Sequence, residues 1–457
     1  MHARANGGRS DSLSGAALWS PVAPRGMSRL NTLSFDHVAI PAFSGRLIDR
    51  IRANSLFLSS WGRWRQRAFH RAYERRRDSY ARAARERGLV YDDQSVPARV
   101  RARYSARGYV PSRRSPGTVH TLAFMPNIGW HQHLMPDLRE LGPVSWFDYA
   151  ALGYSWDEFA RADRAAIVRR ATMNAEFLAY VRRVHAEKAV DWIFVYAGGL
   201  ELSAATLRRI REEFGIPLVG MCLDDKNSWE GAFMGDHRAG QVDIAAEFDI
   251  AWTSARVACE WYLVEGGCPL YLPEGFDRGA FRPMPVEPDI PASFVGSAYG
   301  FRPRIIGQVR ERGVPLRVFG RGWPTGEFAR DPVEIYNRSR INVGLGEAGY
   351  SETLTNVKGR DFEIPATGGG VYLTSYNADL AQHYTIGDEI LCYRGVDELI
   401  EQLRYYLDHP ELTRAMSARA RARSLAEHRW LHRYRHICTL LGVLEPEAGA
   451  ALTDLRL

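Results

Sequence analysis

Apolar runs alternate with amphipathic segments along the chain from residue 118 onward. Short continuous apolar runs are typical of buried strands, whereas apolar positions spaced three or four residues apart are typical of helices. The first series of runs predicts strands at residues 118–125, 144–149, 192–196, 217–223 and 250–253. Helices are predicted between them, including 163–188 and 203–214, and Ser203 is suited to cap the latter. Such alternation predicts a parallel, doubly wound sheet with right-handed crossovers.

A second alternating series follows the segment Pro273-Glu-Gly-Phe-Asp277, which we interpret as the connection between two domains. The series predicts strands at 293–296, 316–320, 341–345 and 371–373, and helices at 302–312, 333–339, 396–408, 410–426 and 428–441. With 457 residues, the chain is too long for a single core and fits two domains plus an extension. We therefore predict an α/β fold of two doubly wound parallel-sheet domains, at 117–275 and 276–445, that face a cleft.

The first 116 residues have a different pattern and form a predicted N-terminal extension. Residues 1–43 are rich in Ser, Gly and Pro and are expected to be poorly ordered, and Met27 is a second candidate for the start of the chain. Residues 44–88 place apolar side chains at helical spacing among many arginines, which predicts one or two basic amphipathic helices. Such a helix suits packing on the protein or binding at a membrane surface equally well. Residues 89–116 are predicted to be a linker.

The basic charge of the chain lies in this extension. It carries 23 arginines, no lysine and eight acidic residues, a balance of +15, whereas the remaining residues have a balance of −8. Such an arm is suited to an anionic membrane surface, a nucleic acid or the acidic face of the chain's own domains. Because the extension lacks zinc-finger, RNA-recognition and helix-turn-helix signatures, its charge alone predicts no specific nucleic-acid partner.

The remaining composition is that of a globular protein, with 46% hydrophobic and 25% charged residues. The cysteines, at 222, 259, 268, 392 and 438, show no metal-ligand spacing, so we expect buried, reduced thiols and a cytoplasmic protein. No apolar run approaches the length that spans a bilayer, and the N-terminus lacks the apolar core of a secretory signal. Peripheral attachment to a membrane through the extension remains an alternative.

The most informative segment, residues 356–374, combines the cations Lys358 and Arg360, the carboxylate Glu363 and the run Gly368-Gly369-Gly370. Apolar positions predict a short helix that the glycines end, followed by a buried strand. A diphosphate beside a ribose or sugar needs cationic donors, a carboxylate that accepts from hydroxyls, and small residues for close backbone approach. The chain has only three lysines, Lys188, Lys226 and Lys358. Lys358 either makes a point contact to phosphate, or it is one of a few lysines that remain by chance under an arginine-biased codon usage.

Arg360-Asp-Phe-Glu363-Ile-Pro-Ala-Thr-Gly-Gly, followed by Asp388-Glu-Ile, Asp397-Glu-Leu, Tyr405-Tyr-Leu and His409-Pro, resembles the C-terminal domain of the CgeB-type (spore-maturation-protein-like) glycosyltransferases. This family is related to the large glycosyltransferase group with the GT-B fold. The resemblance is strongest over residues 294–441, fainter over 118–277 and absent from the first 115. It implies a GT-B fold, a nucleotide-diphosphate sugar as donor substrate, and neither a cofactor nor a metal.

The resemblance also implies a role for Glu363, which matches the second Glu of the Glu-x7-Glu motif of retaining GT-B enzymes and would accept hydrogen bonds from the nucleotide ribose. The first Glu would fall at Thr355, so the chain departs from the motif, and the contact to the donor sugar and the stereochemistry stay open. The alternative for Glu363 is a helix-surface carboxylate paired with Arg360.

Further candidates follow predicted strands, where ligands bind in doubly wound sheets. For the donor we consider Lys358 and Arg360 with its diphosphate, the backbone N–H groups of Gly296 and Ser297, Gly320 beside the base, and Gly368 and Gly369. For catalysis we consider Asp224, Asp225 and His131, where a carboxylate or imidazole would orient or deprotonate the acceptor hydroxyl. The alternatives are a helix cap or a salt bridge to Lys226 for the aspartates and a surface position for His131 and His133. We do not interpret Asp224-Asp225 as metal ligands.

These observations predict a metal-independent glycosyltransferase that moves a sugar from a nucleotide-diphosphate donor to an acceptor. The alternative is a catalytically silent GT-B-like protein that binds a nucleotide or a partner, because Thr355 replaces the first Glu of the motif. The sequence specifies neither the donor's sugar and base nor the acceptor.

Overall fold

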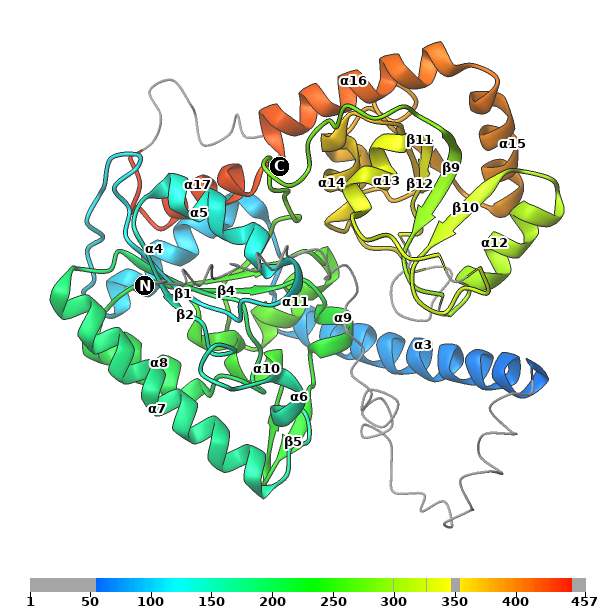
Figure 1. The fold of residues 1–457 in the computed structure, drawn as a ribbon. Helices are drawn as coiled ribbons and strands as arrows, with labels where there is room; N and C mark the ends of the chain where they lie inside the picture. The colour runs from blue at the N-terminus through cyan, green and yellow to red at the C-terminus, as the bar shows by residue number, and fades with distance from the viewer. Residues whose placement is uncertain (1–54, 299, 326, 347–353, 446–457) are drawn as a thin grey trace, which may run out of the picture.

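The computed structural model describes residues 55–298, 300–325, 327–346 and 354–445, with side chains from Arg67 onward. The predicted disordered segment 1–43, Met27 and the first part of the predicted basic helix lie outside these residues. The described chain forms two α/β units, a long N-terminal helix and a last helix that returns to the first unit (Figure 1).

The first unit contains a six-stranded sheet of order β2-β1-β3-β4-β7-β8, in which all neighbours are parallel. Its strands are β1 Thr121–Phe124, β2 Val144–Phe147, β3 Trp192–Val195, β4 Leu218–Cys222, β7 Ile250–Thr253 and β8 Pro269–Tyr271. Its helices are α5 Met135–Leu141, α6 Trp156–Phe159, α7 Arg164–Glu187, α8 Ala204–Phe214, α9 Asp225–Ser228, α10 Gln241–Ile244 and α11 Arg256–Val264. A small antiparallel hairpin, β5 Ala232–Met234 with β6 His237–Ala239, and the short 3₁₀ turns η2 Gly129–Leu134 and η3 Ala245–Glu247 complete it. The Ser203 hydroxyl accepts from the Thr206 N–H at 3.1 Å, which confirms the predicted cap.

The second unit contains a five-stranded parallel sheet of order β10-β9-β11-β12-β13. Its strands are β9 Ile290–Val295, β10 Leu316–Phe319, β11 Ser339–Val343, β12 Val371–Ser375 and β13 Leu391–Tyr393. Its helices are α12 Arg302–Glu311, α13 Pro332–Arg338, α14 Arg360–Thr367, α15 Val396–Leu407 and α16 Pro410–Glu427, with the 3₁₀ turn η4 Leu380–Gln382. Two doubly wound parallel sheets confirm the predicted fold class, the GT-B type with a helical N-terminal extension.

The N-terminal helix α3, Ser55–Glu86, packs on the first unit along its C-terminal half. The Tyr80 ring contacts Trp229 and Trp261 at centroid distances of 5.7 and 5.8 Å, and its hydroxyl donates to Glu265 at 2.7 Å. From Arg67 onward, therefore, this basic amphipathic helix is packed on the protein, one of the two alternatives left by its sequence. Its N-terminal part extends away from the first sheet (Figure 1).

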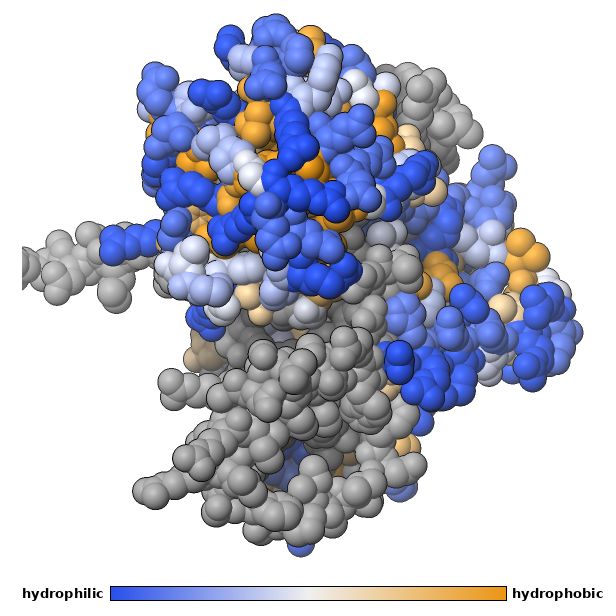
Figure 2. All heavy atoms as spheres, turned by 90° about the vertical axis from the view of Figure 1, so that its right-hand side faces the viewer, coloured by the Kyte–Doolittle hydropathy of each residue, from blue (hydrophilic) through white to orange (hydrophobic). Residues whose placement is uncertain are grey.

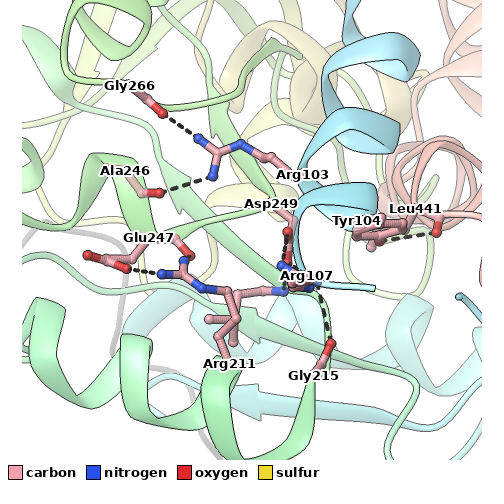
Figure 3. Close-up of polar contacts among 11 residues, drawn as sticks. Arg103, Tyr104, Arg107, Arg211, Gly215, Ala246, Glu247, Asp249, Gly266 and Leu441 are labelled. Carbon is pink, nitrogen blue, oxygen red and sulfur yellow. Dashed lines mark hydrogen bonds and ion pairs between the residues drawn. The ribbon is translucent and has the colours of Figure 1, made fainter. Parts of the chain in front are cut away.

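The prediction that residues 89–116 form a linker is wrong. This segment contains the 3₁₀ turn η1 Asp93–Ser95 and helix α4 Val96–Ala106, whose side chains Val96, Val100 and Tyr104 are buried. The Tyr104 hydroxyl donates to the Leu441 carbonyl at 3.1 Å, and Arg107 forms a two-point ion pair with Asp249 at 2.6 and 3.1 Å (Figure 3). Arginines of the extension thus pair with carboxylates of the first unit.

The last helix, α17 Trp430–Leu440, follows the second unit in sequence but packs on α5 and α4 of the first (Figure 1). Trp430 and Tyr434 join the core on the face of the first sheet that carries Trp192 and Phe194. Arg429 fixes the start of the helix by donating to Asp137 and Glu140, both at 2.7 Å. The chain therefore crosses between the units twice. The two crossings lie side by side, because the Phe276 N–H donates to the His428 carbonyl at 3.2 Å and the Trp430 N–H to the Phe276 carbonyl at 3.3 Å.

All five cysteines are buried and free, as predicted. Hydrophilic residues predominate on the face of the molecule seen in Figure 2, where apolar residues show in small groups between them. None of the helices in the described ranges combines the length and apolarity needed to cross a bilayer.

Candidate active site

The two α/β units meet where strand β4 of the first sheet and strand β11 of the second end. Lys226, on the short helix α9 directly after β4, donates from Nζ to the Thr355 carbonyl at 3.1 Å and to Asn356 Oδ1. Thr355 and Asn356 belong to the segment that leads from β11 to α14. Ligands of doubly wound sheets bind at the carboxyl ends of the strands, so this junction is the candidate site.

Local hydrogen bonds set the start and end of helix α14. Asp361 accepts from the Lys358 N–H at 2.7 Å and from the Tyr372 hydroxyl at 2.6 Å, which fixes the first turn. Gly368 has a φ of 68°, the left-handed conformation that ends the helix as predicted. Residues Asp361–Thr367 are all buried, so Glu363, with 8% exposure, does not have the helix-surface position considered for it from the sequence.

Two carboxyl groups border the backbone at Gly359. A Cβ at this glycine would lie 2.7 Å from Oε2 of Glu274 and 3.3 Å from Oε1 of Glu363, so the absence of a side chain makes room for both. Burial raises the pKa of Glu274 to about 8, against the lowering effect of the Lys358 cation. Burial, and next the neighbouring Glu274, raise the pKa of Glu363 well above its usual range. Burial and the like charge of the other group therefore both favour the neutral form of each carboxyl group.

Cations surround this carboxyl pair. Lys358 and Arg360 are half-buried and act electrostatically on Glu274 and Glu363, respectively. Lys226 reaches the same place from the other unit, and burial together with the Lys358 charge lowers the pKa of its ammonium to about 8. Two of the three lysines in the chain therefore meet at the junction.

The two predicted catalytic aspartates lie in different environments, one exposed and one buried. Asp224 is exposed at the end of β4, and its charge acts on both Tyr196 and Glu274, so it faces the site. Asp225 is fully buried, and its carboxylate accepts from the hydroxyls of Thr253 and, at 2.8 Å, Tyr262. Buried hydroxyls therefore engage both carboxylate oxygens of Asp225, and the catalytic role predicted for it stays a prediction.

His131 lies on the side of the site formed by the first unit. Its ring is 5.0 Å from both Trp130 and Tyr196 between centroids, and Nδ1 is hydrogen bonded to the Ile128 carbonyl. Burial lowers the pKa of His131, which favours the neutral imidazole. His133 instead lies 3.3 Å from Asp277, in the connection between the units.

The loops after β9 and β10 bind each other. The Gly296 N–H donates to the Phe319 carbonyl at 2.8 Å, and the Gly296 carbonyl accepts from Trp323 Nε1 at 2.7 Å. The Gly296 N–H is therefore engaged within the protein, and the donor-binding roles predicted for Gly296 and Ser297 stay predictions. A Cβ at Gly320 would overlap the Gly296 carbonyl. Close packing of the two loops therefore accounts for a glycine at this position.

Gly368 and Gly369 lie at the opposite edge of the second sheet from the candidate site. Helix α14 carries the chain about 12 Å, from the carboxyl end of β11 to the amino end of β12. A Cβ on Gly368 would lie 2.7 Å from the Arg421 side chain, and one on Gly369 would lie 2.7 Å from the Tyr336 carbonyl. Packing against α16 and α13 accounts for these two glycines, and the donor-binding role predicted for them stays a prediction.

Sequence reasoning missed Glu274 as a site residue. The sequence places this carboxylate between Pro273 and Gly275, in the segment that we interpret as the connection between two domains. Such a connection borders both units, and a charged side chain on it is therefore placed at their junction. Among the residues with described side chains, no three or more His, Cys, Asp or Glu side chains form a group suited to a metal ion.

The fold and the site together define a two-unit α/β protein of the GT-B class with a mixed cation and carboxyl site between its sheets. Residues 302–439, which include α14, match the family model described as Glycosyl transferase-like. No curated protein is similar in sequence to the chain.

Similar solved structures include sucrose-phosphate synthase from Thermosynechococcus elongatus, with 13% identity and a TM-score of 0.46 over 71% of this chain and 100% of that one. HepE from Anabaena in complex with UDP-glucose has 11% identity and a TM-score of 0.46, over 71% and 100% of the two chains. The OtsA apo structure has 10% identity and a TM-score of 0.46, over 72% and 100%. The fold class follows from the chain's own sheet topology.

Proposed function

We propose that this protein is a glycosyltransferase that transfers a sugar from a nucleotide-diphosphate donor to an acceptor hydroxyl. The observation that carries the proposal is the meeting of Lys358, Arg360 and the carboxyl pair Glu274–Glu363 at the carboxyl edge of the second sheet. Three of these four residues lie in or directly before α14, inside the segment that matches the glycosyl transferase-like model.

The proposed chemistry uses each group in a distinct way. A bond forms between the acceptor oxygen and the anomeric carbon of the sugar, while the bond from that carbon to the diphosphate breaks and the nucleotide leaves with the electron pair. Lys358 and Arg360 stabilise the negative charge that develops on the diphosphate. Glu363 accepts hydrogen bonds from the ribose, and Asp224, the exposed carboxylate facing the site, accepts the proton of the acceptor hydroxyl.

Isothermal titration with UDP, GDP, ADP and dTDP tests the donor class. We expect at least one to bind the folded protein, and binding by none would contradict the proposal. The protein is then incubated with sugar conjugates of the nucleotide that binds. We expect slow hydrolysis that releases the sugar, even without the acceptor. Binding without any release, across several sugars, would favour the catalytically silent alternative that Thr355 suggests.

A further inference from the structure

The three lysines of the chain divide into two that meet at the candidate site and one that does not. Lys226 has 8% exposure and reaches from α9 of the first unit to the segment before α14 of the second. Lys358 comes from that segment and is close enough to affect the Lys226 charge. Lys188 is exposed and lies at the end of α7.

The hydrogen bonds of Lys226 leave part of its ammonium group unused. An ammonium has three N–H donors. The Thr355 carbonyl and Asn356 Oδ1 accept two of them, and both acceptors are neutral. Within the described part of the chain, neither Lys226 nor Lys358 has a carboxylate at ion-pair distance. Two neighbouring ammonium groups therefore lie at the junction, and their mutual repulsion favours the binding of an anion.

Hydrogen bonds to neighbouring elements fix the backbone around Lys226. Its neighbour Asp225 is fixed by the hydroxyls of Thr253 and Tyr262, and the Lys226 carbonyl accepts from Arg76 of helix α3 at 3.0 Å. Arg76 also pairs with Glu230 at 3.3 Å. A long cationic side chain on a fixed backbone is the arrangement expected of a preorganised anion ligand, because little ordering remains when the anion binds.

We propose that Lys226 is the second lysine ligand of the donor's diphosphate, supplied by the first unit, with its third N–H donated to a phosphate oxygen. The inference rests on the proposed function, which places the diphosphate at Lys358. It predicts a donor site that needs both units, whereas a purely structural Lys226 would only hold the segment that contains Thr355 and Asn356.

Lys226→Met tests the inference because methionine keeps an unbranched side chain of nearly the same length and removes the charge. The probes are inorganic pyrophosphate, the nucleoside diphosphate that binds the wild type most tightly, and its free nucleoside. We expect affinity for pyrophosphate and for the diphosphate to fall about tenfold or more, with affinity for the nucleoside unchanged. Lys188→Met makes the same change of charge away from the site and should alter none of the three affinities.

Equal losses for the diphosphate and the nucleoside, or no loss for either, would overturn the role of Lys226 and leave the proposed function standing. Failure of the wild type to bind any nucleoside diphosphate would overturn both.

A second measurement uses the wild-type protein, in case Lys226→Met does not fold. Acetylation by an amine-specific reagent, followed by mass spectrometry, reports on each of the three lysines separately. Pyrophosphate should slow the acetylation of Lys226 and Lys358 and leave that of Lys188 unchanged. Protection of Lys358 without protection of Lys226 would contradict the inference.

Discussion

Gly359 is the residue on which the geometry of the candidate site depends, because the carboxyl groups of Glu274 and Glu363 occupy the space where a side chain would be. One of these groups comes from the connection between the units and the other from α14. The site therefore draws carboxyl groups from two distant parts of the sequence, and each can be changed separately.

Glu363→Gln is expected to leave the fold intact and to weaken nucleotide affinity roughly ten- to a hundredfold. Glutamine keeps the shape of the protonated carboxyl group, but its amide nitrogen cannot accept from a ribose hydroxyl, so at least one hydrogen bond is lost. A hydrogen-bonding group that is left buried and unpaired costs about 1–3 kcal/mol. Titration calorimetry with the best nucleoside diphosphate measures the effect, and Arg360→Ala should weaken diphosphates far more than the nucleoside. A Glu363→Gln protein that unfolds, yet binds normally once stabilised, would make Glu363 a structural residue only.

Glu274 should make the protein less stable as the pH rises. Its pKa is about 8 in the folded protein, above the ordinary value of 4.5, so between these values the folded state binds more protons than the unfolded state. The free energy of unfolding therefore falls as pH rises through this range. Glu274→Gln should flatten the dependence between pH 5 and 8 in chemical denaturation, whereas an unchanged slope would show that other groups set it.

At the scale of elements, helix α4 shows how a short amphipathic helix is mistaken for a linker. Its buried positions, Val96, Val100 and Tyr104, are spaced four residues apart, but arginines occupy much of the sequence between them. One of those arginines, Arg103, donates to carbonyls of the first unit, those of Ala246 and Gly266 (Figure 3). Local sequence does not contain these partners, which come from more than 140 residues away.

We expect Tyr104→Ala to lower the free energy of unfolding by about 3 kcal/mol or more, because it empties a buried aromatic position. Tyr104→Phe removes only the hydrogen bond to the Leu441 carbonyl and should cost about 1 kcal/mol. Urea denaturation of both variants measures the difference. Wild-type stability in Tyr104→Ala would mean that α4 contributes little to the first unit.

The elements that sequence predicted well are those whose pattern is local. The strands at 192–196 and 250–253 are continuous apolar runs, and they match β3 and β7 to within a residue. The function of glycines and aspartates was harder to predict, because it depends on the edge of the sheet or the side of the loop where each residue lies. Gly368 and Asp225 have the types expected of a ligand site, but tertiary packing places the first at the far edge and buries the second.

At the scale of the whole molecule, the two units are joined by packing as well as by the chain. Helix α17 supplies Trp430 and Tyr434 to the core of the first unit, and Arg429 links the helix to two carboxylates of α5. Because α17 comes last in sequence, loss of the C-terminus affects the unit that is most distant from it along the chain.

A protein that ends at Glu427 should therefore expose the face of the first sheet that carries Trp192, Phe194 and Trp252. We expect it to aggregate or to bind an apolar fluorescent dye strongly, because an uncovered sheet face of this size is an apolar patch. Gel filtration and dye fluorescence measure the two outcomes. As a control, a protein that ends at Glu445 keeps α17 and should behave like the full chain. If the protein that ends at Glu427 is a soluble monomer and does not raise the fluorescence of the dye, the role given to α17 is contradicted.

The place of α17 also sets an order of events during translation. The ribosome completes β8, the last strand of the first sheet, at Tyr271, but it does not synthesise Trp430 until almost 160 residues later. At bacterial to eukaryotic elongation rates this interval lasts roughly ten to thirty seconds. During that time the nascent first unit has one face of its sheet without its final cover. We therefore expect chaperones that shield apolar surfaces to bind the emerging chain.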